Sequence, residues 1–136
     1  MNSALWGFSV GLGVALLARW TRFDRDKSFY PIVLIVIAFY YVLFAVLYGS
    51  ERALLTQLVI ATAFCAIAIA GRRIGVYCVA AGIAAHGVYD FAYATFGIDH
   101  GAPQWWPVFC GVIDIILGAA AVAAVKLAPQ RDSPIS

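Results

Sequence analysis

Three ionisable side chains, His86, Asp90 and Asp114, interrupt two apolar stretches of this chain. His86 and Asp90 are four residues apart, which places them on one face of a helix. At membrane depth each charge costs about 2.5–3.5 kcal/mol on insertion scales, so such residues usually face protein or water and serve a function. An imidazole beside two carboxylates supplies a proton donor and a proton acceptor at one place. General acid–base catalysis needs that arrangement, and so does a proton relay or a proton-coupled carrier.

The two aspartates are predicted to lie at the same depth. Asp90 comes seven residues before Gly97, where its stretch ends, and Asp114 comes seven residues after Pro107, where the next stretch begins. At 1.5 Å per residue, each carboxylate lies about 10 Å below the same boundary of an antiparallel helix pair. Two carboxylates this close in a low dielectric resist ionising together and should titrate as a coupled unit. We therefore predict His86, Asp90 and Asp114 as catalytic residues.

Further polar side chains are predicted in the same layer. Gln57 enters its stretch from the same side, and Tyr93 continues the face of His86 and Asp90, with Tyr89 beside it. The predicted ligand-binding residues are Gln57, Tyr89, Tyr93, Cys110 and Trp106. Since the opposite halves of the stretches are much less polar, the pattern favours a polar pocket that opens outward. The connection at residues 97–106 would then be a lid or a plain surface loop, with Asp99, His100 and Gln104 at the rim.

Two alternatives to acid–base chemistry remain for these residues. The first is a structural pair that fixes helix packing, although polar contacts between membrane helices contribute only about 0.6 kcal/mol on average. The second is a metal site, with Cys110 or His100 as a further ligand, but the spacing matches no strong metal motif. A haem would require His86 and His100 to face each other from different levels of one hairpin. We predict no metal, and the cofactor is unknown.

The composition identifies the class of protein that must position these groups. The chain has 136 residues, of which 64% are hydrophobic and 12% charged. Soluble domains contain roughly 25% charged residues. A soluble domain of this size could not bury so much apolar surface. The high apolar content and low charged content also argue against a disordered chain and against a secreted disulfide scaffold. The net charge of +2 is too small and too dispersed for a nucleic-acid-binding protein. The chain is therefore predicted to be an integral membrane protein whose principal partner is the lipid bilayer.

The predicted fold is all-α, a bundle of five transmembrane helices. A helix that crosses a hydrocarbon core of about 30 Å needs roughly 20 apolar residues. The expected spans are residues 3–18, 29–48, 53–70, 74–96 and 107–125. One five-helix transmembrane domain then occupies residues 1–128, and residues 129–136 form a polar cytoplasmic tail.

The distribution of basic residues predicts the orientation. Eight of the nine Lys and Arg residues fall after the first span, after the third span or in the tail, and only Arg52 falls on the other side. Positive charge concentrates in cytoplasmic segments. The N-terminus is therefore expected outside, the C-terminus in the cytoplasm, and the protein in the inner (plasma) membrane as a multi-pass protein.

Three segments resemble a family of small uncharacterised bacterial membrane proteins. They are RFDRDKSFYP at residues 22–31, HGVYD at 86–90 and PQWWPVFCGVID at 103–114. The resemblance implies a small helical membrane bundle and no assigned activity. Relatives often carry further histidines after the HGxxD segment, where this chain has Tyr93 and Ala94. That departure puts a metal site here in doubt.

Three functions are compatible with the sequence. The first is a membrane-embedded protein that binds, and could convert, a small lipophilic molecule by acid–base chemistry. The second is a proton-coupled carrier or ion channel, expected as a homo-oligomer because one bundle is small for alternating access. The third is an accessory subunit of a larger membrane complex, for which Gly7 and Gly11 would be a lipid-facing contact stripe. The same glycine pair fits a helix contact inside the monomer or between monomers. The sequence does not decide whether the protein is an enzyme.

Overall fold

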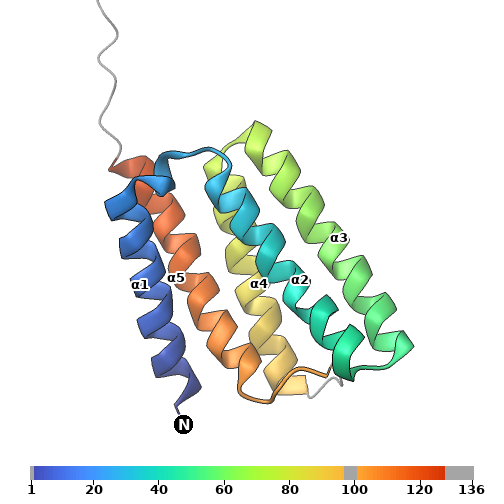
Figure 1. Cartoon of the computed structure of the whole chain (residues 1–136). Helices are drawn as coiled ribbons and strands as arrows, with labels where there is room; N and C mark the ends of the chain where they lie inside the picture. The colour runs from blue at the N-terminus through green and yellow to red at the C-terminus, as the bar shows by residue number, and fades with distance from the viewer. Residues whose placement is uncertain (1, 97–100, 128–136) are drawn as a thin grey trace, which may run out of the picture.

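The computed structural model describes residues 2–96 and 101–127, and these residues form an all-α bundle without strands (Figure 1). Five long helices and one 3₁₀ turn follow each other along the chain. They are α1 (Ser3–Thr21), η1 (Phe23–Arg25), α2 (Phe29–Tyr48), α3 (Glu51–Ile74), α4 (Val76–Phe96) and α5 (Trp106–Lys126). The predicted fold class is therefore confirmed as a helical bundle. The predicted boundary between domain and tail, at 128–129, lies outside the described residues.

The helix ends follow local sequence signals. The Asn2 and Ser50 side chains accept hydrogen bonds from backbone N–H groups at the starts of α1 and α3, which satisfies donors that have no partner within the helix. Gly75 separates α3 from α4 with a φ of 142°, a value that side-chain-bearing residues rarely adopt. The expected spans ended at residue 70 and began again at residue 74. The observed break lies at Gly75 instead, so α3 continues through residues 71–74 and α4 begins at Val76.

Four of the five long helices, α1, α2, α3 and α5, are long and apolar enough to cross a membrane. Their exposed faces carry large apolar side chains such as Leu5, Ile32 and Val59. The helix outside this group is α4, although it has 21 residues like α5. Its apolar character is lowered by His86 and Asp90, and both side chains are buried within the bundle. The ionisable residues therefore lie on the helix that packs against α2, α3 and α5.

Glycines allow two pairs of helices to approach closely. A Cβ atom at Gly87 of α4 would lie 3.0 Å from the Gly111 backbone oxygen of α5, and a Cβ at Gly111 would lie 3.1 Å from the Gly87 oxygen. On the other side of α5, a Cβ at Gly7 would lie 2.5 Å from the Phe109 backbone oxygen. Such contacts between backbones require residues without side chains.

The contact of α1 with α5 corrects one expectation. Gly7 and Gly11 are buried, and α5 covers both of them. They form a helix contact inside the monomer and not a lipid-facing stripe. The sequence feature that favoured an accessory subunit is therefore absent from the surface.

The two ends of the bundle differ in charge. One end of the bundle contains the α1–α2 connection, the α3–α4 connection and the last turn of α5 (Figure 1). Among the described residues, the cations at this end are Arg19, Arg22, Arg25, Lys27, Arg72, Arg73 and Lys126. We call it the basic end. At the opposite end, the start of α3 carries Arg52 beside Glu51.

Candidate functional site

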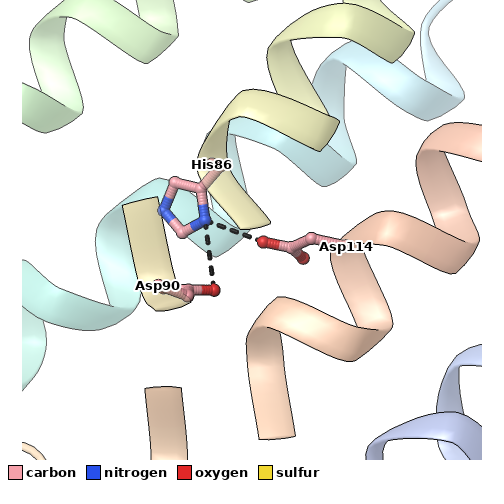
Figure 2. Close-up of side chains that lie close together, drawn as sticks. All are labelled: His86, Asp90 and Asp114. Atoms are coloured by element: carbon pink, nitrogen blue, oxygen red, sulfur yellow. Dashed lines mark hydrogen bonds and ion pairs between the residues drawn. The ribbon is translucent and has the colours of Figure 1, made fainter. Parts of the chain in front are cut away.

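The structure brings His86, Asp90 and Asp114 together (Figure 2). His86 Nδ1 lies 2.8 Å from Asp114 Oδ2 across the α4–α5 contact, and 3.6 Å from Asp90 Oδ2 one turn along α4. A single imidazole nitrogen therefore faces both carboxylates. The predicted convergence of the two aspartates from antiparallel helices is confirmed. We call these three residues the acid–imidazole group.

This group is sealed inside the bundle. The relative exposures are 2% for His86 and 0% for both aspartates. Besides His86, Asp90 interacts with the Tyr41 hydroxyl and with the Asp114 carboxyl group. Among the described residues, no backbone N–H group and no Lys or Arg side chain donates a hydrogen bond to either carboxyl group. Because a buried charge without hydrogen bonds is costly, the group has a strong electrostatic reason to hold protons or another cation.

Aromatic rings enclose the imidazole on the side away from α5. The Phe64 ring of α3 meets the imidazole edge-on at a centroid distance of 4.9 Å. The Tyr41 ring of α2 lies 6.2 Å away, and the Tyr89 ring of α4 lies 5.9 Å away. These rings exclude water and lower the local dielectric, which strengthens the interactions within the group. Phe64 was not predicted, because one Phe among the many apolar residues of α3 gives no sign of its neighbour.

Gln57 joins two of the tyrosines into a second buried network. Its side-chain amide nitrogen donates to the Tyr93 hydroxyl at 2.6 Å, and its amide oxygen accepts from the Tyr89 hydroxyl at 3.0 Å. Gln57 is 2% exposed and Tyr93 also 2%. Gln57, Tyr89 and Tyr93 therefore lie next to each other, as we predicted for a ligand-binding layer. Whether they bind a ligand stays a prediction.

The other two predicted ligand-binding residues have different surroundings. Cys110 is buried on α5 one turn before Asp114, with an exposure of 8%. Trp106 lies two turns before Asp114, at the start of α5, and its ring packs against Tyr40 at 5.2 Å and Phe44 at 5.0 Å. Its ring contacts among the described residues are thus with α2 and with neighbours on its own chain segment, and not with the acid–imidazole group. The Trp106 side chain therefore packs the start of α5 against α2.

No outward opening reaches the group through the described residues, since all three of its side chains are buried. Of the residues predicted at the rim of a pocket, Gln104 is exposed, while Asp99 and His100 lie outside the described residues. The predicted lid at residues 97–106 falls partly in the same gap. In this conformation the acid–imidazole group is a closed site rather than the floor of a pocket.

Comparisons with family models, with curated proteins and with solved structures find no match for this chain. The resemblance of the three sequence segments to a bacterial family therefore stays a prediction. The chemistry of the site has to be argued from its geometry alone.

The arrangement can perform two kinds of chemistry. The His86 Nδ1 atom and one oxygen from each aspartate lie within 4.8 Å of one another, so the three residues could hold a metal ion. Zinc sites use such nitrogen and oxygen donors, usually in sets of four, at about 2.0–2.2 Å. The group can equally share protons, because the 2.8 Å contact of His86 with Asp114 is a hydrogen bond that holds a proton between nitrogen and oxygen.

Proposed function

We propose that this chain is an integral membrane protein in which the acid–imidazole group binds and releases a proton, and that it acts as a carrier or channel for protons. One observation carries the proposal: a single imidazole nitrogen is shared between two fully buried carboxylates. Polar and ionisable residues within membrane spans commonly mark proton relays and ion pathways. The closed state of the site favours the proton over a larger substrate, because a proton needs no cavity.

The number of protons determines the charge of the group. Relative to a neutral imidazole and two carboxylates, two added protons make the group neutral, whereas one added proton leaves a charge of −1. A change of one charge in a low dielectric strongly alters the attraction between α4 and α5. The carboxylate oxygens of Asp90 and Asp114 are the atoms at which a proton would enter or leave, because no Lys or Arg side chain of the described residues neutralises them. Proton exchange would thus be coupled to the packing of these two helices, which is what a carrier requires.

We propose that α4 is a fifth membrane span and that the basic end is cytoplasmic. The support for the fifth span is that α4 has the same length as α5 and packs antiparallel to it across the Gly87–Gly111 contact. The support for the orientation is the excess of cations at the basic end. In the proposed orientation the N-terminus lies outside the cell, and the protein lies in the plasma membrane of a bacterium. Single cysteines at exposed Arg22 and Arg52, in a chain without its three native cysteines, test it: an impermeant maleimide added to intact cells should label position 52 and not position 22.

Conversion or binding of a small lipophilic molecule is the second candidate. The observation that favours it is the aromatic wall of Tyr41, Phe64 and Tyr89 beside the imidazole, with Gln57 behind it as a polar contact. Such a mixture of rings and few polar groups is typical of small-molecule sites. This function requires that α4 and α5 separate to admit the molecule. It therefore demands an open conformation that proton exchange does not.

Proton flux into proteoliposomes tests the first candidate. Vesicles are loaded with a pH-sensitive dye and potassium, and valinomycin lets the potassium leave, so that the interior becomes electrically negative and attracts protons. The vesicle interior should acidify faster with the protein than without it. Asp90→Asn and Asp114→Asn remove a proton-binding oxygen at nearly constant size, and each should reduce the flux at least tenfold. Glu51→Gln is the matched control, because this carboxylate is exposed at the start of α3 and does not belong to the acid–imidazole group, and it should leave the flux unchanged.

If the wild-type protein carries no proton flux while its helix content is intact, the carrier proposal is wrong. The lipophilic-molecule function would then be tested by extracting bound lipids from the purified protein. A molecule that is retained by the wild type and lost in Asp114→Asn would support it. Chemical crosslinking in the vesicles would show whether the active form is a homo-oligomer.

A further inference from the structure

A second site lies at the basic end, distant along the helices from the acid–imidazole group. A cavity of about 430 Å³ opens between the α1–α2 connection and the junction of α3 with α4. Its rim carries four exposed cations, and its lining also includes Asp24 and Asp26. The cations are Arg25, Lys27, Arg72 and Arg73. The proposed proton chemistry uses none of these residues.

The acidic residues of the rim are already engaged. Asp24 forms an ion pair with Arg19 at 3.1 Å, and its side chain is only 3% exposed. Asp26 Oδ1 accepts a hydrogen bond from the Ser28 backbone N–H at 2.7 Å. In contrast, none of the four rim cations forms an ion pair within 4.0 Å with any residue that the structure describes. Asp26 keeps its charge, because a backbone N–H group does not neutralise a carboxylate, but the four cations outnumber the two lining carboxylates, and the cavity presents a net positive charge.

Part of the cavity lining is apolar. It consists of the buried Pro31 and Val79, the half-buried Val76 and the exposed Val125, which come from α2, α4 and α5, and we call it the floor. An inorganic anion would gain nothing from such a floor. A ligand with an anionic head and a glycerol or acyl portion would contact both the rim and the floor. The combination of charge and apolar lining therefore favours an amphipathic ligand over a free ion.

The surroundings of the cavity identify the source of that ligand. At the same end, the large apolar side chains of Trp20, Phe23 and Ile74 are exposed by 82%, 61% and 75%. Exposed aromatic and apolar side chains at helix ends are typical of the boundary between lipid and water. Basic pockets between helices on the cytoplasmic side of a membrane bind anionic headgroups.

We propose that this cavity is a binding site for the phosphate headgroup of an anionic membrane phospholipid. The phosphate contacts Arg25 and Lys27 from one connection and Arg72 and Arg73 from the other, so one lipid bridges two segments that are distant in sequence. The apolar part of the lipid lies against the valines of the floor. The bound headgroup would hold the start of α2 against the junction of α3 and α4.

Native mass spectrometry of the whole chain in detergent tests the site. The protein is titrated with dioleoyl phosphatidylglycerol or with dioleoyl phosphatidylcholine as separate probes. We expect one tightly bound phosphatidylglycerol and weaker binding of the zwitterionic lipid. Arg25→Gln combined with Arg72→Gln should weaken phosphatidylglycerol binding about 25-fold, since each cation near a membrane surface contributes about fivefold.

A charge-matched control separates the site from general surface charge. Arg22→Gln combined with Arg52→Gln removes two exposed cations that do not line the cavity, and it should change binding less than twofold. Equal loss in both double variants, or equal binding of the two lipids by the wild type, would overturn the proposal. Competition by millimolar inorganic phosphate that removes the lipid completely would also overturn it, because the site would then be one for free phosphate. All four positions are exposed, and circular dichroism checks that each variant remains helical.

Discussion

His86 and Asp114 form a 2.8 Å hydrogen bond across two antiparallel helices whose backbones touch at the neighbouring glycines. Gly87, the next residue after His86, would place a Cβ atom 3.1 Å from the Asp114 Cβ. Gly111, one turn before Asp114, lies against the same part of α4. The geometry of the acid–imidazole group is therefore set by the small size of these two residues, in addition to the chemistry of its members.

Adding one methyl group at this contact should disturb the site. Gly87→Ala forces the Asp114 side chain or the α5 backbone to move, and overpacking of this kind costs about 1–3 kcal/mol. We expect a lower free energy of unfolding and at least a tenfold loss of proton flux, measured by denaturation in mixed micelles and by the vesicle assay. Gly13→Ala is the control, because its Cβ would meet nothing within 4 Å and alanine favours the helix by up to about 1 kcal/mol. If both variants behave alike, close approach of the helices does not position Asp114.

The sequence predicted those parts of the structure that depend on local pattern. The second span was predicted at residues 29–48 and is observed as Phe29–Tyr48, because continuous apolar sequence and flanking polar residues define a membrane helix. The meeting of Asp90 with Asp114 followed from counting residues along two antiparallel helices. In both cases one helix or one hairpin contains all the information.

Features that depend on how several helices pack could not be predicted. The closed state of the acid–imidazole group comes from Tyr41 and Phe64, which belong to α2 and α3 and whose side chains carry no signal of their tertiary neighbours. Trp106 was placed at the site by its distance along α5, but its ring points toward Tyr40 and Phe44 of α2. The cavity at the basic end also needs two connections to come together. Each of these outcomes is a matter of relative helix rotation, which sequence periodicity does not specify for such uniformly apolar helices.

Replacing one member of the acid–imidazole group should lower the free energy of unfolding more than replacing two members. His86→Leu leaves both carboxylates buried without the imidazole, and breaking a buried pair costs about 3–5 kcal/mol. The double variant with His86→Leu and Asp114→Leu removes one of those charges and should recover at least half of that loss. Unfolding in mixed micelles measures both. Since the double variant should still carry no proton flux, its recovery would separate stability from function. A double variant less stable than either single variant would contradict an electrostatic pairing of these residues.

Substitutions of Gln57 and Tyr93 should have non-additive effects on the free energy of unfolding. Gln57→Leu removes both the donor to Tyr93 and the acceptor for Tyr89, and loss of a buried hydrogen-bond partner costs about 1–3 kcal/mol. Tyr93→Phe should cost less, because it removes one hydroxyl. The double variant should be less destabilised than the sum of the two by about 0.5–2 kcal/mol, as measured in a double-mutant cycle. Strict additivity would show that the 2.6 Å contact contributes nothing. Thr62→Val, which removes a hydroxyl bonded only to its own helix, provides a control at the exposed face of α3.

A metal titration discriminates the proton site from a metal site made of the same three residues. The group offers three ligand atoms, and its shortest contact is already a hydrogen bond between His86 and Asp114. A metal ion would have to displace that proton and would still lack the fourth ligand that zinc usually takes. After incubation with Zn²⁺ or Mn²⁺ and gel filtration, elemental analysis should therefore find far less than one ion per chain. The result should be the same for the wild type and for Asp90→Asn. One tightly held ion per wild-type chain, absent from Asp90→Asn, would show that the buried charge is neutralised by a metal and would replace proton exchange as the chemistry of this site.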